Sequence, residues 1–306
     1  MSEGFATELT LSGPLRAPKQ MLAEQEYGGH LSIHDDKTAE ELGFQAGPIE
    51  GPTHFSQFDP LLASIWGDAW FERGCISAHY QNMCVEGDEV RAHCSVPDPG
   101  AKRVTLWAEK ADGTPVLSGT AALGPDHPET ELDRRRAKLR PPERLVILED
   151  LHVGMKGANA ETVSMDFDQN MGALYPFSLA QKLTKITEPS PYYDPATAAS
   201  SPWQRAIIPF EMISVLAEYS SREARWPVKG PAIGLFADLE IRMIDGPLFV
   251  GEEYALEREV VTLSESRRTE SYWVQSTIRD SEGATRCIVL LNHATLKDSY
   301  EGYPKG

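Results

Sequence analysis

The chain carries an internal repeat, and this repeat limits the folds open to it. Residues 78–96 and 239–261 each read as an apolar strand, a turn with Gly beside an acidic residue, and a second strand of alternating polarity. A further hairpin follows each copy, with its turn at 111–114 in the first half and at 281–283 in the second. A unit repeated over about half of a 306-residue chain predicts two similar domains that face each other.

Each half also places one apolar helix ahead of its strands. In the first half, apolar residues recur at helical spacing from Thr53 onward, and Pro60 should kink this helix or shift its start. In the second half, Pro209-Phe210 begins a helix with one apolar face. The apolar faces are formed by Phe55, Phe58, Leu62, Ile65 and Trp66 in the first helix and by Phe210, Ile213, Leu216 and Tyr219 in the second.

Strand patterns follow each helix, and a hairpin signal joins two of them at Asp112-Gly113. The expected strands are 75–84, 90–96, 103–110 and 116–123, then 239–243, 254–263, 270–279 and 286–296. A helix wrapped by antiparallel strands, made twice, predicts an α+β fold of the double hotdog type, with two antiparallel sheets each wrapped around a central helix. The two sheets are expected to pair edge to edge, because this leaves no exposed edge at the join.

The predicted domains are an N-terminal hotdog domain at 1–124, a crossover linker at 125–144 and a C-terminal hotdog domain at 145–306. The linker is marked by four prolines around a charged run, which indicates a solvated helical stretch between domains. A short helix at 37–42 is expected before the first central helix, with an Asp cap at its start and Gly43 at its end.

Charge and composition exclude several functions. The formal net charge of −17 argues against nucleic acid or an anionic membrane as the main partner. No apolar run approaches the roughly 20 residues of a membrane span, and the N-terminus lacks the features of a secretory signal, so a cytoplasmic location is expected. The four cysteines have no CxxC spacing, and no P-loop, GxGxxG, HExxH or GxSxG motif is present. We therefore expect no metal and no cofactor.

Several short motifs resemble those of the MaoC-like, double-hotdog hydratase and dehydratase family. The stretch IHDDKTAEELGF at 33–44 is similar to the I-H-x-D segment of that family, and Pro-Ile-Glu-Gly at 48–51 is similar to its I-x-H-G entry to the central helix. The turn at 84–90 resembles the P-V-x-x-G-D-x-V turn, which recurs at 249–253. Together these motifs extend the resemblance over most of the chain.

The resemblance implies reversible addition of water to a 2-enoyl thioester. In that chemistry a carboxylate and a histidine activate the water, and a backbone N–H at the helix start polarises the thioester carbonyl. The chain departs from the family pattern here. Gly29 stands at the Asp position of D-x-N-P-x-H, Glu50 replaces the His before Gly51, and the stretch taken to correspond in the second half, at 191–194, has no histidine.

Four residues are predicted to be catalytic, namely His34, Asp36, Glu50 and His54. Each has a structural alternative. His34 is a loop histidine beside helix caps, and Asp36 is itself a candidate cap. Glu50 precedes a helix whose dipole favours a carboxylate there, although partial burial would also suit it to proton transfer. His54 is otherwise a packed core residue of the helix.

A second set is predicted to bind the substrate carbonyl or the substrate. Gly51 is the oxyanion candidate, because its N–H is expected to point from the helix start, although a glycine is also common in turns. Thr53, Tyr193 and Asp194 are the remaining members, and the Tyr-Tyr-Asp-Pro sequence around the last two is also typical of a turn.

The predicted function is that of a hydro-lyase acting on an enoyl or 3-hydroxyacyl thioester, or on a related activated carbonyl. A non-catalytic acyl-ligand-binding hotdog protein and a hotdog thioesterase, with Glu50 activating water, are the alternatives. A small-molecule substrate and a homodimer are the expected partners. The linker carries a basic run that is expected either to pair with nearby acidic residues or to bind the phosphates of coenzyme A. The run comprises Arg134, Arg135, Arg136, Lys138 and Arg140, and the acidic residues are Glu129, Glu131 and Asp133.

Overall fold

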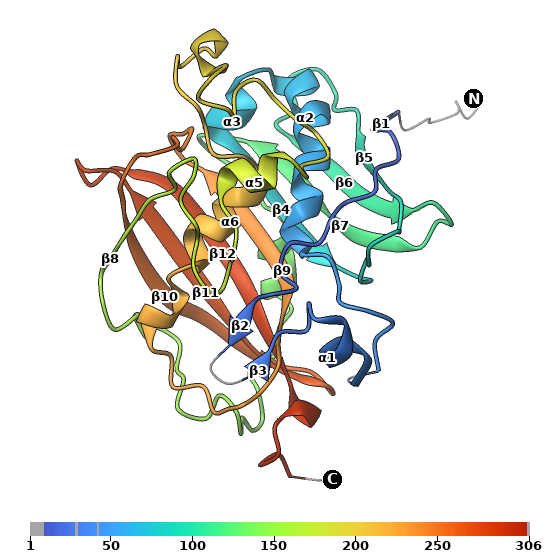
Figure 1. Ribbon diagram of the computed structural model, residues 1–306, viewed down its shortest axis with the longest axis vertical. Helices are drawn as coiled ribbons and strands as arrows, with labels where there is room; N and C mark the ends of the chain where they lie inside the picture. The colour runs from blue at the N-terminus through green and yellow to red at the C-terminus, as the bar shows by residue number, and fades with distance from the viewer. Residues whose placement is uncertain (1–8, 28–29, 42, 305–306) are drawn as a thin grey trace, which may run out of the picture.

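The computed structural model describes residues 9–27, 30–41 and 43–304, and one curved antiparallel sheet forms its centre (Figure 1). A separate two-stranded ladder is formed by β2 (Glu26–Tyr27) and β3 (His30–Leu31). From edge to edge, the ten strands of the main sheet are β1 (Thr10–Ser12), β5 (Val90–Ser95), β6 (Arg103–Lys110), β7 (Pro115–Leu123), β4 (Gly74–Tyr80), β9 (Gly234–Met243), β12 (Thr285–Leu296), β11 (Thr269–Arg279), β10 (Tyr254–Glu265) and β8 (Glu161–Val163).

The two halves of this sheet have the same strand order when they are read outward from the middle. The first half runs β4, β7, β6, β5, β1, and the second runs β9, β12, β11, β10, β8. At the middle, β4 pairs antiparallel with β9, and Ile76 lies opposite Ile241. The predicted edge-to-edge pairing is therefore confirmed, and it joins the two expected sheets into one.

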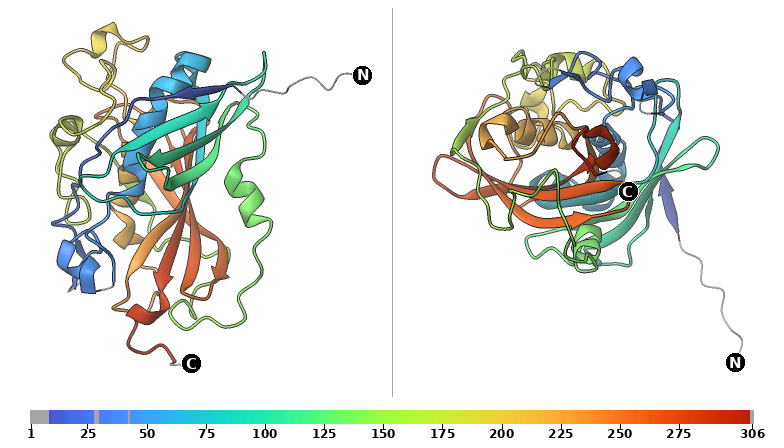
Figure 2. Two further views of the ribbon diagram at one scale, coloured as in Figure 1. Left: turned by 90° about the vertical axis from the view of Figure 1, so that its right-hand side faces the viewer. Right: turned by 90° about the horizontal axis from the view of Figure 1, so that it is seen from below.

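Helices cover both faces of the sheet unequally. Figure 2 shows the central helices on one face and α4 on the other. The helices are α1 (Asp36–Glu41), η1 (Gly51–Phe58), α2 (Asp59–Trp66), α3 (Ala69–Arg73), α4 (Glu131–Arg136), α5 (Leu179–Leu183), η2 (Ala198–Ser200), α6 (Phe210–Glu218), η3 (Ser221–Ala224) and η4 (Lys297–Ser299). The α+β class and the two central helices, η1 with α2 and then α6, are as predicted.

The first central helix changes its winding at Pro60. Residues 51–58 form a 3-10 helix, and the α-helix begins at Asp59 with Pro60 in its first turn. Proline has no N–H for a bond to the carbonyl four residues earlier, so the carbonyl of Ser56 accepts instead from the N–H of Asp59. Pro60 was expected to kink the helix or to shift its start, and what it marks in the structure is a change from 3-10 to α-helical winding.

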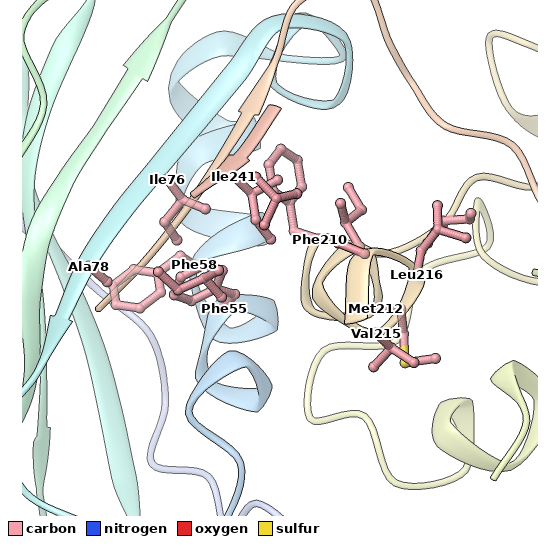
Figure 3. Packing of buried hydrophobic residues seen from close by; sticks show 14 of the residues in the cluster. Phe55, Phe58, Ile76, Ala78, Phe210, Met212, Val215, Leu216 and Ile241 are labelled. Atoms are coloured by element: carbon pink, nitrogen blue, oxygen red, sulfur yellow. The ribbon is translucent and has the colours of Figure 1, made fainter. Parts of the chain in front are cut away.

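One apolar core runs under both halves. Phe55, Phe58 and Leu62 of the first helix are fully buried, and in Figure 3 the two phenylalanines point toward Ile76 and Ala78 of β4. The second helix contributes Phe210, Met212, Val215 and Leu216 to the same cluster. Because this core crosses the β4–β9 join, the two repeats bury each other's apolar helix faces.

Local signals place most element ends within a few residues. The Oδ1 atom of Asp35 accepts from the N–H of Thr38 at the start of α1, and Gly43 ends that helix with φ +83°. Leu42, the predicted last residue of the helix, lies outside the described residues. The strand expected at 75–84 is shorter, because β4 ends at Tyr80 and the chain then leaves the sheet.

The linker is less solvated than predicted. Leu132 of α4 is fully buried against the sheet, in a small cluster with Trp273 and Leu290. A capping box at Thr130 and Asp133 starts the helix. The helix is therefore packed across the join of the two halves, although the exact domain boundaries remain a prediction. Within the described ranges, the structure contains no helix of sufficient length and apolarity to span a bilayer.

Candidate functional site

A cavity of about 1080 Å³ lies where η1 begins and β4 ends. Its wall on this side includes His34, Glu50, Gly51, His54 and Tyr80, all from the first half. The second half contributes both polar and apolar side chains to the lining, and its rings include Tyr175, Phe236, Tyr272 and His293. The cavity therefore brings three of the four predicted catalytic residues, and the predicted oxyanion glycine, to one enclosed space between the repeats.

The entry to η1 is held in place by its neighbours. The N–H of Ile49 donates to the carbonyl of Cys84 at 2.7 Å, which ties the entry loop to the chain beyond β4. A Cβ on Gly51 would lie 2.5 Å from Cζ of Tyr80, so only glycine fits against this ring. Pro52 follows in the first turn, where a missing N–H costs no helix bond. Gly51 is thus the first residue of η1 and lines the cavity, at a helix end where backbone N–H groups have no partner within the helix.

His34 is oriented by a backbone carbonyl. Its Nδ1 lies 2.6 Å from the carbonyl oxygen of Pro48. Because a carbonyl can only accept, Nδ1 carries the proton, and the lone pair of the neutral ring lies on Nε2. Burial lowers the pKa of His34, although the Pro48 carbonyl and the Glu50 carboxylate oppose this effect. The ring is therefore neutral near pH 7 and able to accept a proton at Nε2.

Glu50 is part of a buried ionic cluster. Nζ of Lys182, on α5 of the second half, lies 3.5 Å from Oε1 of Glu50 and 3.5 Å from Oε1 of Glu211 in α6. The same ammonium donates to Oγ1 of Thr53 at 2.9 Å. Burial raises the pKa of Glu211, and the ammonium of Lys182 partly offsets that rise. The Lys182 ammonium thus lies near two carboxyl groups, behind the residues that line the cavity.

His54 lies on the same wall but is more deeply buried than His34. Burial, and next the Lys182 ammonium, lower the pKa of His54 to about 4. Among the described residues, Nδ1 of His54 has no hydrogen-bond partner. The ring is therefore neutral over the physiological range.

The remaining predicted site residues lie away from the cavity wall. Asp36 accepts from the N–H of Gly47 at 2.8 Å, and Asp194 accepts from the N–H of Ala196 at 2.8 Å. The hydroxyl of Tyr193 donates to Oδ2 of the buried Asp59 at 2.9 Å. Thr53 is buried beside Lys182 and is absent from the lining. The structure therefore does not bring Asp36, Tyr193 or Asp194 together with His34, and their assignment to the site remains a prediction.

A polar cluster lies along another part of the same cavity, on the face that α4 covers. Oδ1 of Asp238 is 2.8 Å from Nδ1 of His79 and 3.1 Å from Nε of Arg135, and Oδ2 accepts from Asn292 at 2.7 Å. Arg134 pairs with Glu131 at 3.1 Å. These members of the basic run are paired with acidic groups, as the first of the two interpretations predicted, although Asp238 comes from the sheet.

Lys182 is the residue that sequence reasoning missed. The structure shows that α5 follows β8 and precedes the second central helix, as α1 follows β1 and precedes the first. By this order of elements, 179–183 takes the place of α1, and the stretch at 191–194, expected to correspond to the His34 region, lies beyond it in the chain. A local signal was present, because Ser178 and Gln181 form a capping box at the start of α5.

No protein-family model and no curated protein sequence matches the chain. Solved structures do match it. A protein described as a MaoC domain protein dehydratase, from Chloroflexus aurantiacus J-10-fl, is 14% identical with a TM-score of 0.57, and the match covers 95% of each chain. A conserved hypothetical protein of Mycobacterium tuberculosis with a double hotdog fold is 13% identical with a TM-score of 0.55, over 95% of this chain and 96% of the other.

A third structure, described as a MaoC-like dehydratase, is 12% identical with a TM-score of 0.51, over 94% of this chain and 97% of the other. The three matches span nearly the whole of each chain, so both repeats and the join between them are shared. The chain therefore has the double hotdog fold found in MaoC-like dehydratases.

Proposed function

We propose that the protein is a hydro-lyase that adds water to, or removes it from, an enoyl or 3-hydroxyacyl thioester or a related activated carbonyl. The observation that carries this proposal is the meeting of His34, Glu50 and Gly51 on one cavity wall. Two of the solved structures that share the fold are described as dehydratases, which supports the same reaction class.

The reaction assigns one task to each group. Nε2 of His34 takes a proton from water, the water oxygen bonds to the β-carbon, and the imidazolium then gives that proton to the α-carbon, so H and OH add across the double bond. Glu50 orients the water and stabilises the imidazolium that forms on His34. The N–H of Gly51 donates to the thioester oxygen, where negative charge develops, and the positive end of η1 favours that charge.

The second-half wall suits the acyl part of such a substrate. Tyr175, Phe236 and Tyr272 line the cavity across from the first-half residues, and their rings offer apolar surface to a hydrocarbon chain. Polar groups lie on the second-half side as well, among them Asp238 and Asn292. The aromatic rings suit the apolar tail of a substrate whose reactive carbonyl lies at the start of η1.

The test is turnover of a panel of 2-enoyl-CoA thioesters of increasing length, followed by loss of the conjugated double bond. His34→Ala and Glu50→Gln are each expected to lower kcat/KM by about 10²-fold or more, because each removes a group that acts on the water. The matched control is His152→Ala, a histidine that is exposed on a loop and should leave turnover unchanged. Equal rates for His34→Ala and the control would reject the role of His34.

A hotdog thioesterase is the second candidate, and Glu50 is the observation that favours it. A carboxylate at the start of a central helix, beside a free N–H, is suited to activate water for attack on the thioester carbonyl. Release of free thiol from a saturated acyl-CoA separates this reaction from hydration, which leaves the thioester intact. Ligand-induced stabilisation with neither reaction would indicate the non-catalytic alternative.

A further inference from the structure

Lys182 is a buried cation supplied to the first-half cavity by the second half of the chain. Its side chain is 2% exposed, and its ammonium contacts Glu50, Glu211 and Thr53 and lies 5.6 Å from the centre of the Phe177 ring. Glu50 immediately precedes η1, and Glu211 lies in the first turn of α6. The ammonium therefore bridges the beginnings of the two central helices.

This position is unfavourable for a cation unless carboxylates accompany it. Burial disfavours any charge, and the N-terminal end of a helix carries partial positive charge that repels an ammonium. Neither η1 nor α6 has a side-chain cap at its start. Burial opposes the charge on Lys182, yet the carboxyl groups of Glu50 and Glu211 raise its pKa above the ordinary value. The ammonium stays charged because of these two partners.

The two carboxyl partners of Lys182 differ in their access to the cavity. Glu50 belongs to the cavity wall, whereas Lys182 and Glu211 do not. Burial raises the pKa of Glu211, although the Lys182 ammonium opposes this rise. Of the two carboxyl groups, Glu50 is the one that a bound molecule can reach.

We propose that Lys182 is a positioning residue that holds the Glu50 carboxylate ionised and oriented at the cavity wall. The proposal deepens the proposed function and rests on it for its catalytic meaning. It also gives the repeat a role, because the reactive carboxylate of one half depends on a cation from the other. Besides Lys182 and Glu50, the titratable side chains of the cluster and of the adjoining wall are His34, His54, Tyr80, Cys84 and Glu211.

A purely structural ion pair would make a different prediction. Replacing one member of a buried pair usually lowers stability whatever the pH, while removing both members is often neutral. A positioning role requires in addition that the protonation of Glu50 changes when Lys182 is removed. The decisive readout is therefore the titration of Glu50 itself.

The experiment follows the carboxyl carbon of Glu50 by NMR in protein labelled with ¹³C at glutamate, with the signal assigned by its absence in Glu50→Gln. In Lys182→Met, the titration midpoint of Glu50 is expected to rise by about one pH unit or more, because an ammonium within 4–6 Å favours the ionised form. The matched control is Glu211→Gln, which keeps the ammonium and should leave the midpoint unchanged or lower it. An unshifted midpoint in Lys182→Met overturns the proposal.

If Lys182→Met fails to fold, Lys182→Gln provides the same loss of charge with a polar side chain, and the same shift is expected. Turnover then separates the two proposals. In an active enzyme, the low-pH limb of the kcat/KM profile should move to higher pH in the Lys182 variant but not in Glu211→Gln. A wild-type protein that is inactive on every thioester rejects the proposed function, and the NMR titration still decides whether Lys182 governs Glu50.

Discussion

Two buried clusters in the structure each place a single cation between two glutamates. In the first, Lys182 lies between Glu50 and Glu211; in the second, Arg258 of β10 lies between Glu161 of β8 and Glu218 at the end of α6. The cation is buried in both, at 2% and 4% exposure. The clusters share their composition, yet they differ in geometry and in how tightly the cation is bound.

The arginine cluster is the tighter of the two. The guanidinium makes two bonds to Glu161, at 2.8 Å and 3.2 Å, and reaches Glu218 at 3.2 Å and the backbone carbonyl of Ala217. The lysine contacts its carboxylates only at 3.5 Å. The planar guanidinium of Arg258 holds one carboxylate through two hydrogen bonds, whereas the ammonium of Lys182 acts as a point charge and leaves its carboxylate able to bind another group. The geometry thus suits Arg258 to stability and Lys182 to chemistry.

The largest expected effect separates the clusters by stability. Arg258→Met is expected to lower the free energy of unfolding by about 3–5 kcal/mol, because it leaves a buried carboxylate unpaired. Lys182→Met should lower the free energy of unfolding by a smaller amount, since Glu50 borders a cavity that admits water. Urea unfolding at pH 7 measures both, and the Arg258→Met, Glu161→Gln double variant should recover part of the loss. Equal losses of unfolding free energy in Arg258→Met and Lys182→Met would contradict the distinction between the two clusters.

The second prediction concerns the pH dependence of stability, and it tests Glu218 of the arginine cluster. Burial raises the pKa of Glu218 from 4.5 to about 7, although Arg258 opposes the rise. Between these two values the folded state holds a proton that the unfolded state has released, so this group's contribution to stability falls as pH rises from 4.5 to about 7. A shift of that size corresponds to on the order of 3 kcal/mol.

The measurement is the difference in unfolding free energy between Glu218→Gln and wild type at a series of pH values. The difference should grow in favour of the variant across this window and then level off. Neighbouring groups titrate as well. Asp59, whose pKa burial raises to about 7, has the same sign, and His293, whose pKa burial lowers to about 3, has the opposite sign. The contribution of Asp59 is present in both proteins and cancels to first order. His293 does not cancel, because its Nε2 lies 3.8 Å from Oε2 of Glu218, so both proteins are compared in a His293→Gln background. A flat difference curve in that background would contradict the shift.

How far the sequence predicted these features depends on how local each feature is. The strands, the break at Pro60 and the stop at Gly43 follow from alternation, ring chemistry and backbone conformation within a few residues. His34, Glu50 and Gly51 were found because they lie within one short stretch next to a recognisable helix start. The fold itself was predictable because both halves of the sequence carry the same order of helix and strand patterns.

Lys182 was not predictable in the same way, because its partner Glu50 is 132 residues away. No local pattern indicates which of many lysines folding will bury. The cluster around Asp238 has the same origin, since His79 lies on β4 and Asn292 on β12, and the β9 register sets them beside one another. Long-range pairing of charges is decided by topology, and the sequence contains no periodicity that reports it.

The smallest expected effect comes from a third cation with an acidic neighbour, on the helix that covers the join. Arg134 pairs with Glu131 one turn earlier in α4, at 3.1 Å, and its side chain is 39% exposed. Solvent screens such a pair, so Arg134→Met should change the free energy of unfolding by less than about 1 kcal/mol, and added salt should reduce the difference further. Urea unfolding at low and high ionic strength measures it. A larger loss of unfolding free energy that does not depend on salt would show that Arg134 stabilises the fold as Arg258 is expected to do. Side-chain exposure would then fail to distinguish the ion pairs that stabilise this fold.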